Sequence, residues 1–489
     1  MKTPNLSTPR FARNAVTAAA LTLALVGCTG CAAQQADSAA TQTSTSTGSS
    51  ATASQTDLSS QKLTEADIQT NTSYDDATDG GHAIEADGSS AQYANAAVTK
   101  TGSSSGDEAD FYGENAAVFA ANSATLDLSD LVVSTDGTHA NGVFSYGSGT
   151  TVNISHSLIR TTGNCSGGLM TTGGGTMNAT NVTAETEGNS SAAIRSDRGG
   201  GDVNMYGGYF TTTGTGSPVI YSTADISVED AYLQSSSSQG VVVEGKNSVS
   251  LKDCQLIAAN TSKNSNKSDY YQAVMIYQSM SGDASTGTSS FSMEGGSLTN
   301  ENGDVFFVNN TSCEINLSSA QIVNNDASGV FLRAAAAGWG SEGSNGGKVS
   351  LHASAQSIDG NMLVDSVSAL NLYLQDGSTF TGAVNPTGQT GDVYVELDAN
   401  STWTLTEDSY VSSLTCAQGS INLNGHKLYV NGAEYDGQSA STGSAVDVSA
   451  STSSGSGQQG GAPDAPGGGS SGSGSSNGGT PPAKPESKQ

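Results

Sequence analysis

The fold of this chain is decided by a triplet that reads Leu126-Asp127-Leu128, Val152-Asn153-Ile154, Met177-Asn178-Ala179 and Val203-Asn204-Met205. Two apolar residues flank one polar residue in each copy, which is the alternation of a half-buried β-strand. Successive copies begin 26, 25 and 26 residues apart (152 − 126, 177 − 152 and 203 − 177). Further copies begin at Ile226, Val249, Phe291, Ile315, Val349, Leu372, Trp403 and Ile421. A period in the twenties that is built from short strands predicts one supersecondary unit stacked many times.

Each repeat contains two more predicted strands, one before the triplet and one after it. The first is an apolar run such as Val241-Val242-Val243, and the third follows a bend, as in Ala231-Tyr232-Leu233. The bend holds residues that we expect in a left-handed backbone conformation, namely Asp130, His156, Asn181, Gly207, Asp230, Asp253 and Gly295. No apolar stripe with a period of 3.6 residues is sustained after the N-terminal region, so almost no helix is expected.

This arrangement resembles the right-handed parallel β-helix of the pectin-lyase-like kind, which has three strands per turn and a left-handed residue at the second bend. The likeness covers roughly residues 90 to 432. It implies an all-β, single-stranded rod of about twelve turns, in which parallel strands stack about 4.8 Å apart. Ladders of Val, Ile, Leu, Met and Phe would fill its interior.

The first residues are typical of an export signal. Lys2, Arg10 and Arg13 precede an apolar run over 15–26 that is too short to span a membrane. The run ends Leu25-Val26-Gly27-Cys28, which resembles the bacterial lipobox. The resemblance implies cleavage before Cys28, lipid attachment to its thiol and display on the extracellular face of the membrane through this anchor alone. A plain secretory signal with an incidental cysteine is the alternative.

We therefore divide the chain into a lipoprotein signal peptide (1–27), a disordered tether (28–85), the parallel β-helix (86–436) and a disordered tail (437–489). The tether is rich in Ser, Thr, Ala and Gln, and the tail in Gly, Ser and Pro. Neither composition can bury enough apolar surface to order itself.

The chain is strongly acidic, with 46 Asp and Glu against 17 Lys and Arg and a formal net charge of −29. Such a surface repels nucleic acid and anionic lipid headgroups, so no nucleic-acid partner is expected. The cysteines of the predicted rod (Cys165, Cys254, Cys313 and Cys416) are interpreted as small buried thiols. No CxxC pair or His/Cys metal spacing occurs in the rod, and the five histidines fall at different positions of the turn. No metal site and no cofactor is therefore predicted.

One strip of the predicted rod, along the first strand and the bend after it, differs from the Ser-, Thr-, Gly- and Asn-rich remainder. Five of the 17 basic residues fall there. The predicted ligand-binding residues of the strip are Arg195, Asp197, Arg198, Tyr221, Glu244, Lys246, Tyr277, Asp283, Arg333 and Trp339. By contrast, the middle residues of the triplets form an outward polar ladder (Asp127, Asn153, Asn178, Asn204 and onward), for which stacking alone is the simpler explanation.

Insertions over 263–271, 279–289 and 334–347 lengthen the bends beside this strip. Together they could wall a groove over the first strand, with Tyr270, Tyr271, Tyr277 and Trp339 as stacking faces for sugar rings. A purely structural role stays open: Arg333 would then pair with Asp365, and Trp339 would pin its loop to the rod.

Enzymes of the pectin-lyase-like superfamily act in a groove on the first-strand side. Lyases use clustered carboxylates with calcium and an Arg or Lys base, and hydrolases use paired Asp. These motifs do not carry over, because no Asp pair falls on adjacent first strands; Glu244 with Lys246, near Tyr277, is the nearest acid/base set. Segments 194–200 and 331–335 resemble uncharacterised bacterial surface β-helix proteins, which implies fold and location only.

The sequence thus favours an extracellular, lipid-anchored β-helix that binds a glycan or another cell-surface ligand, as an adhesin does. A carbohydrate-active enzyme, either a polysaccharide lyase or a glycoside hydrolase, is the second hypothesis. A passive surface or spacer protein is the third. Binding of sugars would depend on the aromatic faces of the proposed groove, whereas catalysis would depend on Glu244.

Overall fold

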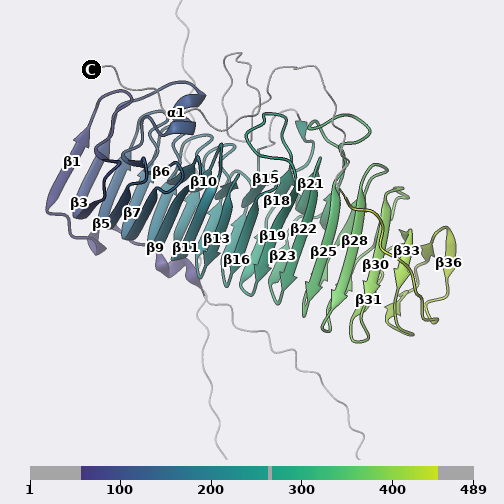
Figure 1. The fold of residues 1–489 in the computed structure, drawn as a ribbon. Helices are drawn as coiled ribbons and strands as arrows, with labels where there is room; N and C mark the ends of the chain where they lie inside the picture. Colours follow the sequence, from purple (N-terminus) through teal and green to yellow (C-terminus); the bar gives the residue numbers. More distant parts are fainter. Residues whose placement is uncertain (1–56, 263–266, 450–489) are drawn as a thin grey trace, which may run out of the picture. The chain divides into compact units, whose positions relative to one another are not determined.

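The chain folds into a parallel β-helix in a computed structural model, which describes residues 57–262 and 267–449 (Figure 1). Strands of successive turns lie side by side and pair in parallel; among the described strands, the pairing of β35 with β36 is antiparallel. The predicted all-β fold is therefore confirmed.

The first strands of successive turns form an eleven-stranded sheet. Its members are β2 (Ile84–Asp87), β4 (Val118–Ala121), β6 (Val143–Tyr146), β8 (Leu169–Thr172), β10 (Ile194–Ser196), β12 (Ile220–Ser222), β15 (Val241–Glu244), β18 (Gln272–Tyr277), β21 (Asp304–Asn309), β24 (Val330–Ala334) and β27 (Asn361–Val364). We call it the first-strand sheet.

The second and third strands share an eighteen-stranded sheet. In the first turns one strand runs through both positions: β1 (Thr72–Asp76), β3 (Ala91–Lys100), β5 (Thr125–Thr135), β7 (Thr151–Thr161), β9 (Gly175–Thr186) and β11 (Gly201–Thr212). Later second strands are β13 (Asp225–Glu229), β16 (Ser248–Lys252), β19 (Thr288–Glu294), β22 (Ser312–Ser318), β25 (Lys348–Ser354), β28 (Ala369–Gln375), β30 (Asp392–Leu397) and β33 (Ser413–Thr415). Later third strands are β14 (Tyr232–Ser235), β17 (Gln255–Ala258), β20 (Ser297–Asn300) and β23 (Gln321–Asn324).

Two small sheets complete the rod. The third strands of the last turns are β26 (Ser357–Asp359), β29 (Thr379–Thr381), β31 (Thr402–Thr404) and β34 (Ile421–Asn422). The other sheet contains β32 (Ser409–Val411), β35 (Leu428–Val430) and β36 (Ala433–Tyr435). The described helices are short: α1 (Asp107–Tyr112) and the 3-10 turns η1 (Leu58–Gln61) and η2 (Glu65–Asp67).

The strand register confirms nine of the predicted triplets as one column. Leu126 pairs with Val152, and the column continues through Met177, Val203, Ile226, Val249, Phe291, Ile315 and Val349. The tenth triplet is shifted by two residues, because Val349 pairs with Leu370. Trp403 and Ile421 lie on third strands, so their assignment to this column is wrong. Second and third strands are both half-buried and show the same alternation of apolar and polar residues. The sequence alone therefore does not distinguish the two kinds of strand.

The bend after the second strand has the predicted backbone conformation. All seven residues expected to be left-handed have a positive φ, from 44° at His156 to 66° at Gly207. Asp, Asn and Gly tolerate this conformation better than other residues, which explains their recurrence here.

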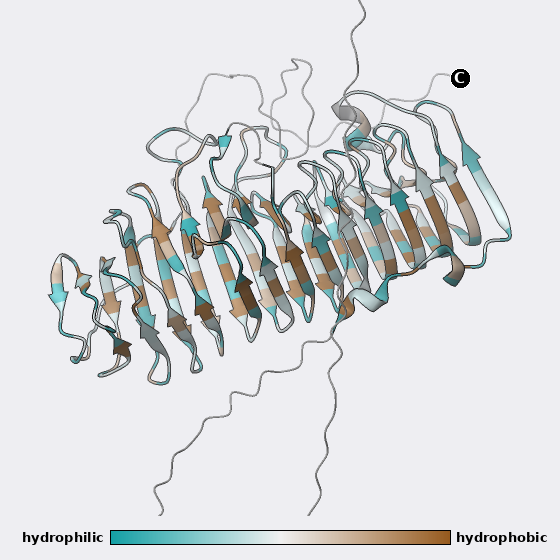
Figure 2. Ribbon diagram, turned by 180° about the vertical axis from the view of Figure 1, so that it is seen from behind, coloured by the Kyte–Doolittle hydropathy of each residue, from teal (hydrophilic) through white to brown (hydrophobic). Residues whose placement is uncertain are grey.

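Buried serines shape the third bend. The amide nitrogen of Ala140 donates to Ser166 Oγ, that of Ser166 to Ser191 Oγ, and that of Ser191 to Ser217 Oγ, at 2.9–3.0 Å. Each hydroxyl thereby satisfies a backbone donor that has no strand partner at the bend. The interior beside them is a continuous apolar ladder, visible as bands of hydrophobic residues on the strands in Figure 2.

Residues 57–85 are ordered, which corrects the prediction of a disordered tether over 28–85. The segment 57–71 crosses successive turns in the direction opposite to the rest of the chain: Leu58 N donates to Gln255 Oε1, Leu63 N to Thr183 Oγ1 and Asn71 N to Asn95 O. Side chains of the rod thus satisfy its polar groups, which composition does not reveal. We call residues 57–71 the N-terminal strap.

The predicted tail also begins too early, because residues 437–449 pack on the rod. Ser441 forms an antiparallel bridge with Cys416, Val446 N donates to Asn371 Oδ1, and Ser312 Oγ donates to Val448 O. The predicted signal peptide with Cys28 and the rest of the tail lie outside the described residues. Within 57–262 and 267–449, no helix has the length and apolar character that crossing a bilayer requires.

Candidate functional site

The outer face of the first-strand sheet is covered rather than open. One column of this sheet runs Phe119, Phe144, Met170, Arg195, Tyr221, Val242, Met275, Phe307 and Arg333. Its first three members form an apolar cluster beside α1, where Thr172 Oγ1 donates to Phe111 O at 2.6 Å. The loops that rise from the upper edge in Figure 1 follow β18 and β24 and cover the later members.

Tyr277 and Trp339 are buried in this cover, with no exposed surface. Their rings meet edge to face with centroids 5.2 Å apart, and they pack with Val242, Met275 and Phe307. The expectation that both rings serve as open stacking faces is therefore wrong. Trp339 belongs to the insertion over 334–347 and Tyr277 to the end of β18, and packing the two rings together removes apolar surface from water.

A buried ionic cluster lies beside this apolar cover. Arg195 Nη2 donates to Asp197 Oδ2 at 2.9 Å and lies 3.4 Å from Asp110 Oδ2. Burial disfavours the charged guanidinium, but the carboxylates of Asp110 and Asp197 reverse this and raise the pKa of Arg195. Burial also raises the pKa of Asp197 to about 6, although Arg195 opposes the shift.

Arg198 connects this cluster to the two segments that cover the first-strand face, α1 and the loop after β18. Its Nε forms an ion pair with Asp283, and its guanidinium lies 3.6 Å from the ring centroid of Phe111 in α1. Arg198 is also half exposed, with 44% of its side chain accessible. The pair therefore lies at the rim of the covered face.

Glu244 forms the second polar centre. Its Oε2 accepts hydrogen bonds from the hydroxyls of Tyr221 and Tyr277, the latter at 3.0 Å, and a side-chain contact with Ser279 also favours the charged form. Burial raises the pKa of Glu244 to about 7, and the nearby charge of Asp283 contributes in the same direction. Burial likewise raises the pKa of both tyrosines. A carboxyl with this pKa can exchange a proton near neutral pH.

The structure brings most of the predicted site residues together. Asp283 interacts with both Asp197 and Glu244, so the ionic cluster and the Glu244 centre adjoin. Lys246 is exposed at the bend after β15. Arg333 is separate: its Nε and Nη2 donate to Asp304 at 2.6 and 3.1 Å, and it lies 4.1 Å from the ring centroid of Tyr270.

The expected pair of Arg333 with Asp365 is wrong. The residue opposite Arg333 on β27 is Leu363, and the carboxylate of Asp365 accepts hydrogen bonds from Ser368 Oγ at its own bend and from Ala336 N in the loop after β24. Asp304 lies at the start of β21, on the preceding turn instead of the following one. A repeat alignment gives the turn of a residue but not the direction in which a long side chain points.

Asp110, His139 and Cys165 lie beside Arg195 or one another but are not among the predicted site residues; Cys165 was interpreted only as a buried thiol. Asp110 lies in α1, and His139 and Cys165 occupy the third bend of successive turns. Their spacing, 165 − 139 = 26, equals the repeat period, so the two were predictable neighbours. The position of Asp110 was not predictable, because α1 lies outside the repeat.

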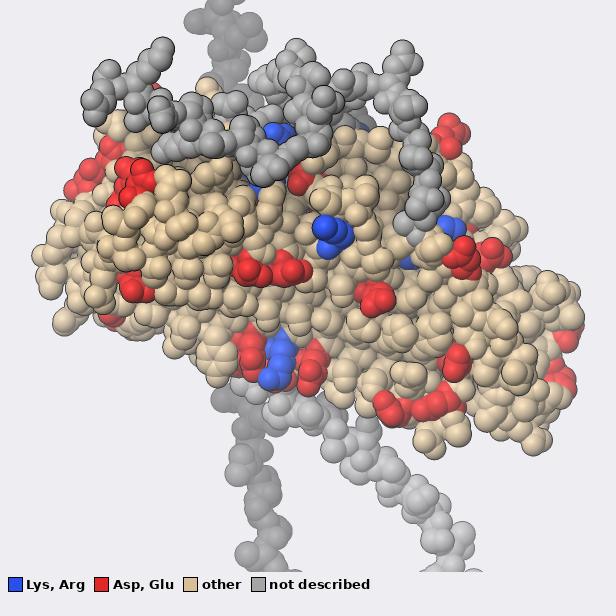
Figure 3. Space-filling model, in the orientation of Figure 1, with Lys and Arg blue, Asp and Glu red and all other residues tan. Residues whose placement is uncertain are grey.

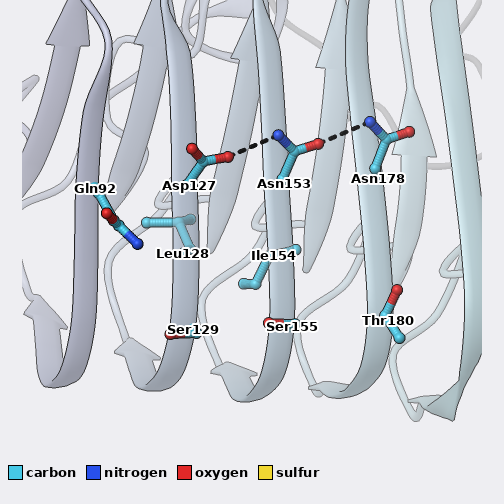
Figure 4. Close-up of a pocket in the computed structure, with 9 residues that line it drawn as sticks. All are labelled: Gln92, Asp127, Leu128, Ser129, Asn153, Ile154, Ser155, Asn178 and Thr180. Atoms are coloured by element: carbon cyan, nitrogen blue, oxygen red, sulfur yellow. Dashed lines mark hydrogen bonds between the residues drawn. The ribbon is translucent and has the colours of Figure 1, made fainter.

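The outer face of the second strands carries a hydrogen-bonded ladder (Figure 4). Asn153 Nδ2 donates to Asp127 Oδ1 at 2.8 Å, Asn178 Nδ2 to Asn153 Oδ1 at 2.9 Å, and Asn204 Nδ2 to Asn178 Oδ1 at 3.0 Å. Each amide in the middle of the ladder uses one N–H and one lone pair in this way. A second N–H and a second lone pair remain on each, available to a ligand.

A shallow hollow of about 340 Å³ lies along this ladder. The residues that line it are Gln92, Asp127, Leu128, Ser129, Asn153, Ile154, Ser155, Asn178 and Thr180. The next residue in the column of Ser129, Ser155 and Thr180 is Tyr206, which is 55% exposed. The face thus combines unused amide groups, hydroxyls and one open aromatic ring.

Most of the surface around this face belongs to uncharged residues, with separate acidic side chains and few basic ones (Figure 3). The hollow itself contains one carboxylate, that of Asp127. A neutral ligand with many hydroxyl groups suits this chemistry better than a polyanion does.

Together these features define a parallel β-helix with a covered first-strand face and an open, polar second-strand face. Comparisons with protein-family models, with curated proteins and with solved structures found no match for this chain.

Proposed function

We propose that this chain is a β-helix protein of the pectin-lyase-like kind that binds a neutral glycan outside the cell, held to the membrane by lipid on Cys28. The observation that supports binding is the second-strand face: a ladder of half-used amides beside exposed Tyr206. Sugar rings present apolar C–H faces and hydroxyl edges, so they need an aromatic surface and hydrogen-bonding groups together.

The regularity of the face favours a polymer over a single sugar. The amides of Asn153, Asn178 and Asn204 repeat at each turn, about 4.8 Å apart. A chain of sugars that lies along the rod axis would meet the same donors and acceptors at every turn. Binding at several weak subsites gives appreciable affinity without a deep pocket.

The first-strand groove expected from the sequence is not part of this proposal. Its aromatic residues Tyr277 and Trp339 are buried, so a sugar could reach them only if the covering loops moved. Glycan binding is therefore proposed at the second-strand face instead of the first-strand groove.

A glycan array probed with the full chain tests the proposal. Tyr206→Ala should weaken the signal on its best glycans about tenfold, which corresponds to the loss of roughly 1.4 kcal/mol in stacking. Tyr410→Ala is the matched control, since Tyr410 is also exposed (37%) but stacks on Tyr429 near the C-terminal end of the rod. Absence of any glycan signal, or equal loss in both variants, would remove the proposal and favour the passive spacer.

Glu244 is the group on which catalysis, the second candidate function, would depend; it is as buried as Tyr277, so a substrate would reach it only after the covering loops moved. Its pKa of about 7 and its two tyrosine partners are suited to general acid–base chemistry. Release of reducing ends from polysaccharides by the wild type, lost in Glu244→Gln and kept in Tyr206→Ala, would favour a carbohydrate-active enzyme over a binding protein.

A further inference from the structure

Three side chains with metal-binding atoms converge where α1 meets the third bend of the rod. One ligand atom each from Asp110, His139 and Cys165 lies within 4.8 Å of the other two. Asp110 Oδ1 and His139 Nδ1 are 2.9 Å apart. Carboxylate oxygen, imidazole nitrogen and thiolate sulfur are the three ligand types that zinc accepts, and around a tetrahedral zinc they are about 3.5 Å apart.

The rod places two of the three at corresponding positions. His139 N donates to Asn164 O and Cys165 N to Asn189 O, so the two residues stack on successive turns. Both have a left-handed backbone, with φ of 56° and 54°. The residues at this position on the next two turns are Ser190 and Gly216. The bend therefore accepts several residue types, and it fixes the backbone of His139 and Cys165 without dictating their side chains.

Burial and charge also suit a cation. Asp110 and Cys165 are 6% and 9% exposed, while His139 reaches solvent. Two carboxylates, those of Asp110 and Asp197, contact one buried guanidinium, that of Arg195, so this cluster has one negative charge in excess when both carboxylates are ionised. A divalent cation that binds with loss of the Cys165 proton would make the whole set neutral. Arg195 contacts Oδ2 of Asp110, whereas His139 contacts Oδ1, so the guanidinium fixes the orientation of the carboxylate; it also lies close enough to Cys165 to interact with it electrostatically.

We propose that Asp110, His139 and Cys165 bind a zinc ion, with one coordination position left for water or a further ligand. The site is independent of the glycan face. The ion would join α1 to two turns of the rod and keep the thiol of an exported protein from oxidation.

A nucleophilic Cys–His–Asp relay fits the geometry less well. In a relay the imidazole lies between the other two groups, and two hydrogen bonds of 2.6–3.2 Å plus the ring separate carboxylate and sulfur by roughly 7 Å. Here the carboxylate and the sulfur lie within 4.8 Å of each other. The three groups converge on a point instead of forming a line.

The test uses the full chain in a Cys28→Ser, Cys31→Ser background, reduced and stripped of metal, with Co²⁺ and Zn²⁺ as probes, because the C-x-x-C pair at 28–31 would bind either metal itself. One Co²⁺ per chain should bind with a thiolate-to-cobalt charge-transfer band, and Zn²⁺ should displace it. Cys165→Ser should abolish the band and weaken zinc binding by more than about 100-fold, beyond what outer contacts cost. His139→Ala should weaken binding similarly.

Two variants serve as matched controls. Cys313→Ser removes another buried thiol, and His156→Ala removes the histidine whose Nδ1 lies 2.7 Å from Asp130 at the second bend. Both should keep the cobalt band. Circular dichroism of each variant without metal reports whether it folds. If a variant does not fold, the cobalt spectrum of the chain without that substitution still tests the proposal. No binding by the Cys28→Ser, Cys31→Ser chain, a cobalt spectrum without the thiolate band, or fast alkylation of Cys165 unaffected by zinc would overturn the proposal.

Discussion

Arg198 forms an ion pair with Asp283, 85 residues away in the sequence, while its guanidinium lies 3.6 Å from the ring centroid of Phe111. One side chain on the rod thus contacts both α1 and the loop after β18. The covers of the first-strand face are therefore coupled through a residue that belongs to neither.

Arg198→Ala should loosen both covers at once. We expect faster amide hydrogen exchange over 107–113 and 278–288, with little change in the strands and a loss of global stability below about 1 kcal/mol, since the ion pair is half exposed. Lys252→Ala is the control, because Lys252 pairs with Glu229 on the neighbouring strand and touches neither cover. Faster exchange in only one cover would contradict the coupling.

Glu244 should make stability depend on pH. Burial raises the pKa of Glu244 from 4.5 to about 7, so between these pH values the folded chain holds a proton that the unfolded chain releases. The stability that this carboxyl contributes is therefore full below pH 4.5 and falls as the pH rises to 7, by up to about 3 kcal/mol. Glu244→Gln removes this pH-dependent contribution to the free energy of unfolding.

Denaturant unfolding at pH 4.5 and 7.5 measures this effect. The wild type should lose stability relative to Glu244→Gln as the pH rises between these values. Glu314→Gln, at an exposed position of β22, should follow the wild type. Parallel pH profiles for wild type and Glu244→Gln would show that the carboxyl is not buried as described.

The left-handed bend predicts which substitutions the repeat tolerates. Asn181 has a φ of 51° at the second bend of its turn. Asn181→Val should lower the free energy of unfolding by about 1–2 kcal/mol, because a β-branched residue is strained there, whereas Asn181→Gly should cost little. Equal destabilisation by both substitutions would place the cost in lost side-chain contacts instead.

The N-terminal strap predicts a stabilising role for Gln61. Its Nε2 donates to Asp230 O at 2.8 Å, and its Oε1 accepts from Gly208 N. Gln61→Ala should lower the free energy of unfolding by about 1–2 kcal/mol, since it leaves a bend amide and a carbonyl without partners. Ser60→Ala, whose hydroxyl contacts Asp57 O in an exposed position, should be nearly neutral. A neutral Gln61→Ala would mean that the strap does not stay bound in solution.

The repeat made the fold predictable, because one pattern recurs nine times in register and each copy supports the others. Leu126, Val152 and Met177 are all large apolar residues at the same position of the triplet. A wrong strand assignment in one copy is therefore recognised by comparison with the neighbouring copies. The pattern failed where it was ambiguous: Leu370-Asn371-Leu372-Tyr373-Leu374 contains two overlapping triplets, and the register uses the first.

The candidate site was predictable only in part. Arg195, Asp197, Tyr221 and Glu244 were found because they depart from a Ser- and Thr-rich background, and they do lie together. Whether a side chain is open or covered depends on loops that obey no repeat, so Trp339 and Tyr277 were expected on a surface and are buried. The positions of Asp110, the N-terminal strap and residues 437–449 were not predictable for the same reason, since they depend on contacts made far along the chain.

Hydroxyl-radical footprinting of the full chain, with and without its best array glycan, tests the proposed function most directly. We expect the glycan to protect Tyr206 and to leave Tyr410 unchanged, since only Tyr206 adjoins the amide ladder. Protection confined to Tyr270 and the covers of the first-strand face, with Tyr206 still fully reactive, would contradict it.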